Sequence, residues 1–596
     1  MVNTTFPAAP DNTGSLIVGS GNGVDQDAGF PGQPGGLGSF EQTGGDHSIG
    51  GNLVLGQSGN VAGGTGTYTL SSGTLHVMTD TLIGGSGLPD GLQDGTGTFT
   101  QTGGTFTTDG AMTVGTGVGT GTYNLSSTDP INNPAVLNTF ITYQNGPNST
   151  FNQAGGTHNT AFLNIYGGEY NLSSGTIEVA GNMGVGHIFN SAAFNQTGGD
   201  VAVNDGTFGL YVGGNAVPAT TGTYTLDDGT LTVAATTHVG SDGVGTFNQN
   251  GGTHTADRLL LGENAGGNGT YNLTGGILND DAIVGDAGVG VVNTSGGTHN
   301  VTGDLILGNK VTGDGTYNVS GTGEVVVTGT TRVGREGSGA LTVADDGRFT
   351  GTGFVTLGSA PGSVGGLVLT DSGALNIDYT GTGAQLLVGD QGTGSASQTG
   401  TSSVTTGSLR VGVQGGSTGT YTMDGGTLGV DDGSGVAGGM RIGLAGNGTF
   451  TQNGGAVNAA YVQIGGANFG QGGGGSGTYN LNGGQLVASG NVDINVDDNS
   501  FGILNVAGGA LAAGNIFNND QLNYSAGSLS ANVSNSANFN VSGGAQRTLT
   551  GNLSNNAGGV LDTAAATPLL VTGVLTNAAT GQIQAGANIT VGADYN

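Results

Sequence analysis

The sequence predicts an all-β protein built as a single long parallel β-solenoid, and three observations support this prediction. A short phrase of glycine, threonine, an aromatic residue and threonine or asparagine recurs along the chain, for example as Gly66-Thr67-Tyr68-Thr69-Leu70. Its aromatic residues follow one another at intervals of about 19 to 31 residues, a spacing typical of repeat architectures. Glycine makes up 131 of the 596 residues, which disfavours helices and supplies the corners that short strands need.

Each repeat contains the elements of one solenoid rung. The aromatic phrase predicts a first strand, and a glycine turn and a second short strand, such as Thr74–Val77, follow it. A third strand ends on an aliphatic residue and glycine, as in Leu53–Gly56, and a loop rich in Gly, Asp and Asn leads to the next phrase. We therefore expect about 23 rungs of roughly 25 residues, with about three short strands per rung.

Two types of rung alternate along the chain. Rungs with phenylalanine carry glutamine two residues later, as in Phe247 and Gln249, whereas rungs with tyrosine carry leucine or methionine there, as in Tyr271 and Leu273. Strand periodicity directs these glutamines inward, where their amides need hydrogen-bond partners. We expect a satisfied polar row near one corner of the solenoid.

The repeat sequences divide the chain into three zones. Residues 1–37 lack the phrase and are predicted to form an irregular N-terminal cap or interaction segment. Residues 38–500 carry the regular solenoid with alternating phenylalanine and tyrosine rungs. In residues 501–596 glycine is less frequent and the long loops are absent, which predicts compact, degenerate C-terminal rungs.

Composition excludes several classes of function. The chain has 8 basic and 40 acidic residues, for a net charge of −32, so its surface repels nucleic acid. The absence of cysteine excludes disulfides, thiolate nucleophiles and cysteine-bound metals. The sequence contains no run of 18 apolar residues, so we expect no transmembrane segment.

The phrase Gly-Thr-(Tyr/Phe)-(Asn/Thr)-(Leu/Gln)-x-Gly-Gly resembles the glycine-rich β-strand repeats of bacterial surface proteins. These include autotransporter-type passengers and related repeats of secreted or surface-anchored proteins, and the resemblance covers most of residues 38–500. It implies secretion to the extracellular space or the cell surface, a β-helical rod, and a role in adhesion or matrix building. The last residues, Asp594-Tyr595-Asn596, carry no sorting tail, so the expectation is a released or processed protein, or a fragment.

Four histidines share one position of the repeat, after the Gly-Gly turn: His47, His158, His254 and His299. Equivalent positions lie at least two rungs apart, or about 10 Å at the usual strand spacing. Zinc–nitrogen bonds are about 2 Å long, so two of these histidines cannot share one ion. We expect them to be structural residues of the core.

Acidic residues gather in the loops that follow the third strand and lead into the next phrase. If these loops stack along one edge, their carboxylates and carbonyls offer the oxygen ligands that Ca²⁺ takes. The candidate calcium residues are Asp242, Glu263, Asp286, Asp314, Asp390, Asp497 and Asp498. A solvated acidic edge without metal is the other interpretation, and we expect no other cofactor.

Catalysis and crystal-surface binding find less support. Hydrolysis of a polysaccharide needs two carboxylates at a set separation, but neighbours such as Asp227-Asp228 and Asp345-Asp346 face opposite ways on a strand. We also expect an active site to interrupt the repeat, and no single insertion stands out. Outward threonine rows could bind ice, but asparagine replaces the second threonine in many rungs. The prediction is that this chain is no enzyme.

The leading hypothesis for function is an extracellular structural protein, the subunit of a cell-surface or matrix fibre that assembles end to end with copies of itself. The alternative is a monomeric β-helical adhesin that binds surface glycans. A polysaccharide-degrading β-helix enzyme is the second alternative.

Overall fold

A computed structural model describes residues 14–19, 36–57, 63–85, 95–117, 119–187, 190–214, 220–378, 385–431, 439–466, 474–497 and 499–595. The chain divides into two compact units, Met1–Asp281 with Gly288–Val292, and Ala282–Ala287 with Asn293–Asn596. The described residues form strands β1 to β55 and no helix, and the pairings within each unit are parallel with one antiparallel bridge in a loop. The predicted all-β parallel solenoid is confirmed, while the number of rungs stays a prediction.

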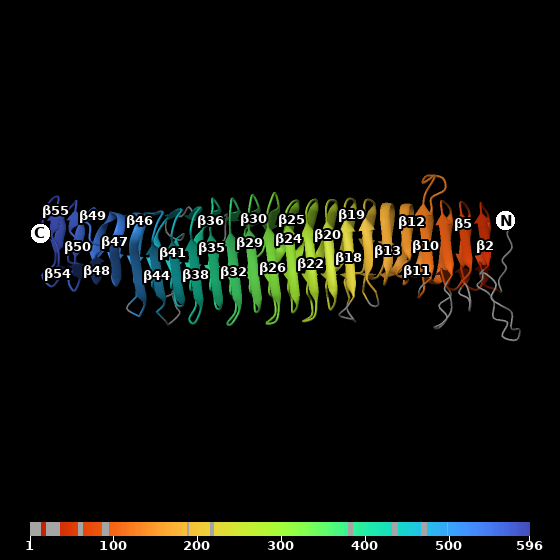
Figure 1. Cartoon of the computed structure of the whole chain (residues 1–596), viewed down its shortest axis with the longest axis horizontal. Helices are drawn as coiled ribbons and strands as arrows, with labels where there is room; N and C mark the ends of the chain where they lie inside the picture. Colours follow the sequence, from red (N-terminus) through yellow and green to blue (C-terminus); the bar gives the residue numbers. More distant parts are fainter. Residues whose placement is uncertain are drawn as a thin grey trace. The chain divides into compact units, whose positions relative to one another are not determined.

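Unit 1 consists of three columns of strands that pair in order along the chain (Figure 1). The first column holds β2 (Leu37–Gln42), β5 (Thr65–Leu70), β8 (Thr96–Gln101), β10 (Thr120–Ser126) and the start of β12 (Thr150–Ile165). The second column holds β3 (Asp46–Ile49), β6 (Thr74–Val77) and the start of β9 (Thr105–Val114). The third column holds β1 (Leu16–Val18), β4 (Leu53–Leu55), β7 (Thr81–Ile83) and the end of β9.

Unit 2 repeats the same three columns. Its first column includes β26 (Asp314–Val319), β29 (Ser338–Val343) and β32 (Val364–Leu369), its second β27 (Glu324–Val327) and β30 (Arg348–Gly351), and its third β28 (Thr331–Val333) and β31 (Val355–Leu357). Toward the C-terminus the turns tighten, and the long strands β46 (Phe501–Asn518) and β47 (Gln521–Asn535) each pair along all three columns.

The predicted N-terminal cap, residues 1–37, lies largely outside the described residues. Within it, β1 pairs in parallel with β4, so this short piece belongs to the third column. The irregular character of the rest stays a prediction.

The core of each unit is a set of stacked side-chain ladders. In β5, buried Tyr68 and Leu70 alternate with half-exposed threonines, as the period of a strand requires. In register with Tyr68, Phe99 and Tyr123 continue the ladder, with ring centroids 5.0 Å apart at each step and planes within 6° of parallel. One rung alone could not bury these rings, so the stack supplies the core.

Glycine at the end of the third strand allows neighbouring rungs to approach closely. Gly240 has φ +68°, and a Cβ placed there would clash with the carbonyl oxygen of Asn268 in the next rung. Both the left-handed backbone and the contact exclude a side chain. No helix capable of crossing a membrane is present among the residues that the structure describes.

Candidate functional site

Buried glutamines join their rung to the tyrosine rung that follows it. Gln249 donates from Nε2 to the carbonyls of Gly252, at 3.3 Å, and Ile277, at 2.9 Å. Its Oε1 accepts a hydrogen bond of 2.5 Å from the Tyr271 hydroxyl. The expected satisfied polar row is confirmed, and it recurs in the pairs Gln42–Tyr68, Gln101–Tyr123, Gln153–Tyr170, Gln196–Tyr224, Gln398–Tyr421 and Gln452–Tyr479.

The histidines extend this network within the core. His158 is fully buried, with Nδ1 3.1 Å from the Tyr170 hydroxyl and Nε2 3.0 Å from the Thr142 hydroxyl. Because the Tyr170 hydroxyl donates to Gln153, its oxygen accepts from Nδ1–H of His158, and Nε2 accepts from Thr142. The same position places His47, His254 and His299 against Tyr68, Tyr271 and Tyr317. The histidines are packing residues with hydrogen-bonded nitrogens, as predicted.

Protonation of His158 is expected to destabilise the fold. Burial lowers the pKa of His158 to about 3, against about 6.5 in an unfolded chain. The unfolded state therefore binds the proton first, and stability that is present above pH 6.5 is lost as the pH falls toward 3. Between pH 7.5 and pH 5 the wild type should lose about 2 kcal/mol more unfolding free energy than His158→Gln in urea titrations. Equal losses in the two proteins would contradict this expectation.

The carboxylates of the predicted acidic edge lie in separate environments. Asp286 is buried and accepts hydrogen bonds from Lys310 Nζ, at 2.6 Å, and Asn309 Nδ2, at 2.5 Å. Glu263 lies 2.9 Å from His238 Nδ1. These two carboxylates therefore contact basic side chains of neighbouring rungs, which occupy positions that a cation would need.

The other candidates are also spread out. Asp390 is half-buried, and loss of hydration raises its pKa although Gln414 donates to it at 3.2 Å. Asp242 and Asp497 lie half-buried in turns, and Asp314 is exposed at the start of β26. Asp498 lies outside the described residues. Within the described ranges, no three acidic or histidine side chains come together as a metal site, and calcium binding stays a prediction.

One place in unit 1 departs from the repeat without an insertion. Elsewhere in unit 1 the third strand is followed by glycine with positive φ, as at Gly84 and Gly186, but asparagine and tyrosine stand there at Asn145 and Tyr166 and neither has positive φ. The connections are short: residues 145–149 join β11 (Val136–Gln144) to β12, and residues 166–167 join β12 to β13 (Gly168–Val179). In most rungs of unit 1 the third strand ends with an aliphatic residue followed by glycine. Here the sequence is Tyr143-Gln144-Asn145, and this difference is the signal that sequence reasoning missed.

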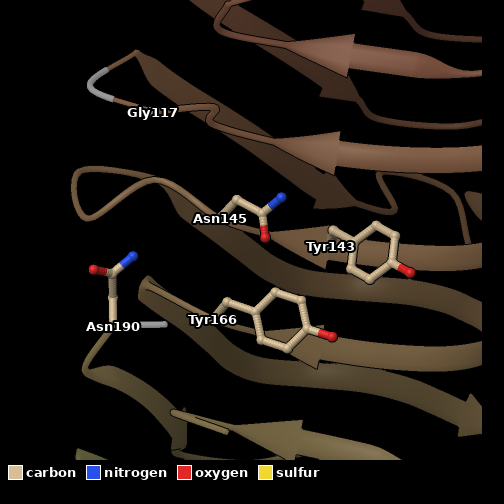
Figure 2. Close-up of a pocket in the computed structure, with 5 residues that line it drawn as sticks. All are labelled: Gly117, Tyr143, Asn145, Tyr166 and Asn190. Carbon is tan, nitrogen blue, oxygen red and sulfur yellow. The ribbon is translucent and has the colours of Figure 1, made fainter. Parts of the chain in front are cut away.

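This departure from the repeat leaves a groove of about 480 Å³ lined by Gly117, Tyr143, Asn145, Tyr166 and Asn190, which we name the tyrosine groove. Figure 2 shows the ring of Tyr143 on β11 and the ring of Tyr166 just after β12, with Asn145 and Asn190 beside them. The ring centroids lie 5.7 Å apart and the planes are 26° from parallel. Both rings are half-buried, and burial, with the neighbouring Tyr143, raises the pKa of Tyr166, so its hydroxyl is neutral.

A row of register positions continues from the groove along the third column, in which Tyr143 and Tyr211 are half-buried and Asn164 is buried. In successive rungs Tyr143 pairs in register with Asn164, Asn164 with Gly184 of β14 (Met183–Val185), and Gly184 with Tyr211 of β17 (Leu210–Val212). Tyr211 then stacks on His238, with centroids 4.3 Å apart. Aromatic and amide side chains thus follow one another across the rungs.

The structure defines the class of this protein as a parallel β-solenoid. In its core, hydrogen bonds between buried glutamine and tyrosine side chains join successive rungs. Comparison with known proteins adds no family: no family model matches the chain, and no curated protein matches it.

Proposed function

We propose that this protein is an extracellular structural protein whose copies associate end to end through rung edges, as in a cell-surface or matrix fibre. The observation that supports this most directly is the edge formed by β54 (Gln582–Ala585) and β55 (Ile589–Val591) in unit 2. β54 pairs with β51 (Val560–Thr563) and β55 with β52 (Leu569–Val571), and the described residues provide no strand on the other side.

The core is open at this edge. Leu561, Leu569 and Val571 are fully buried, whereas their register partners Ile583, Ile589 and Val591 are only half-buried. Residues 582–595 contain no proline and no basic residue, the features that commonly prevent edges from pairing. A further rung would bury these side chains and satisfy the free backbone groups.

Unit 1 offers a complementary edge of the same design. Strand β2 pairs with β5, and none of the described strands lies on its other side. Because β2 and β54 belong to the first column of their units, pairing between copies would continue the same parallel ladder.

Charge placed on the inner face of the edge should prevent association. We expect the purified chain to form filaments in negative-stain electron microscopy and Ile583→Lys/Val591→Lys to remain as single particles, because two lysines would enter the buried face of the joint. The matched control is Gln584→Lys/Thr590→Lys, which adds the same charge at exposed positions of the same strands and should still form filaments.

Single particles of the wild type at high concentration, with and without millimolar calcium, would contradict end-to-end assembly. Filaments that appear only with calcium would assign the joint to the acidic loops.

A further inference from the structure

We propose that the tyrosine groove of unit 1 binds a neutral polysaccharide chain. The inference rests on the near-parallel rings of Tyr143 and Tyr166, the flanking amides of Asn145 and Asn190, and the row of aromatic and amide positions that continues across the rungs.

The tyrosines provide flat apolar surface with a polar tip. The centroid separation of 5.7 Å is wider than the 4.3 to 5.0 Å of the rings stacked in the core of unit 1 from Phe40 to Tyr271, so this pair is less tightly packed. A pyranose ring has one face of C–H groups and hydroxyls around its rim. The faces of the tyrosines suit the C–H groups, and their hydroxyls suit the rim.

The amides provide hydrogen bonds of both directions. Each asparagine side chain offers an oxygen acceptor and an NH₂ donor, which matches adjacent sugar hydroxyls that both donate and accept. Asn145 lies on the turn after β11 and Asn190 on the turn after β14, so they reach the groove from different rungs (Figure 2). Gly117 adds no side chain that would fill the space between them and the preceding rung.

The charge of the site selects a neutral ligand. None of the five lining residues is charged, and the chain carries a net charge of −32, which repels polyuronates and nucleic acids. The volume of about 480 Å³ lies within the range of small-ligand sites.

The direction of the row indicates a polymer. Tyr143, Asn164, Gly184 and Tyr211 occupy register partners in successive rungs, which places the two tyrosines about 14 Å apart at the usual strand spacing. The side chain of His187 lies against Gly184 and beside Tyr211, with the His187 and Tyr211 ring centroids 5.1 Å apart. A linear chain that crosses the rungs can contact the groove and Tyr211 together, which a single sugar cannot.

Affinity electrophoresis of the full chain tests this proposal. All proteins carry Ile583→Lys/Val591→Lys, so that they migrate as single particles and not as filaments. Each native gel contains one neutral polysaccharide: hydroxyethylcellulose, xyloglucan, galactomannan or dextran. A further gel contains alginate as the anionic comparison. We expect retardation in at least one neutral polysaccharide and none in alginate. Tyr143→Ala and Tyr166→Ala should each weaken binding about tenfold or more, because each removes a stacking surface.

Two further variants distinguish a loss of binding from a loss of folding. Phe208→Ala removes another exposed aromatic side chain of unit 1 that is 56% exposed, and it should leave retardation unchanged. Asn190→Ala alters an exposed turn residue, and it should weaken binding several-fold without changing the circular dichroism spectrum or the unfolding midpoint.

Absence of retardation in all four neutral gels would overturn the proposal, as would retardation in alginate alone. Retardation that survives both tyrosine substitutions and Asn190→Ala would also overturn it, since binding would then lie elsewhere. Filament formation by the otherwise wild-type tyrosine variants is expected to persist, so failure of the groove and failure of end-to-end assembly are separate results.

Discussion

Replacing Gln249 with leucine is expected to lower the free energy of unfolding by about 3 kcal/mol, although leucine fits the space. The register partners of Gln249 in the rungs on either side, Leu226 and Leu273, are leucines and fully buried. The cost therefore comes from lost hydrogen bonds: the Tyr271 hydroxyl and two backbone carbonyls would each lose one hydrogen bond in the core. Urea unfolding followed by circular dichroism measures the change.

A second substitution separates these contributions. In Gln249→Leu/Tyr271→Phe the hydroxyl that lost its acceptor is removed together with its contact to His254 Nδ1, at 3.0 Å, so we expect the double variant to be no more stable than the single variant. Thr246→Val, at a half-exposed position of the same strand β20 (Val244–Gln249), should change stability by less than about 0.5 kcal/mol. A Gln249→Leu protein as stable as the wild type would show that the link between rungs contributes nothing to stability.

Replacing Gly240 with alanine is expected to lower the free energy of unfolding by about 4 kcal/mol, or to prevent folding of the affected rungs. The new Cβ would lie well inside van der Waals contact with the Asn268 carbonyl oxygen, and the backbone must keep φ +68° for the turn to form. Relief requires the two rungs to separate, which disrupts the ladder between β20 and β22 (Asn268–Leu273).

The matched control for this change is Gly206→Ala. Gly206 is exposed and does not have positive φ, and no atom lies within 4 Å of the position that the alanine methyl group would take. Alanine should therefore be neutral or slightly stabilising there. Thermal unfolding of both variants measures the contrast. Equal melting temperatures would mean that the rungs can separate at Gly240 without cost.

Much of the fold could be predicted because the repeat exposes its own periodicity. The alternation of Tyr68 and Leu70 with threonines identified the inward face, and the recurring aromatic phrase identified the rungs. The glutamine row followed from the same period, since an inward amide must be hydrogen-bonded. Its partners were beyond sequence reasoning, because Gln249 and Tyr271 lie 22 residues apart and only the rung pairing shows that they meet.

The candidate site was the least predictable part. The acidic loops share a position in the repeat, but Asp286 contacts Lys310 and Glu263 contacts His238, and the sequence shows no sign of these pairings. The tyrosine groove was missed because its residues come from four turns and one strand between Gly117 and Asn190, and the local signal Tyr143-Gln144-Asn145 does not show that these residues meet.

The sequence by itself determined the solenoid class, the inward and outward faces and the structural role of the histidines, because each follows from a local period of two within a repeat. The tertiary structure alone decided which carboxylates have basic partners, where the repeat opens into a groove and which strand edges stay unpaired. These features depend on the lengths of turns and on contacts between different rungs, which no local pattern in the chain encodes.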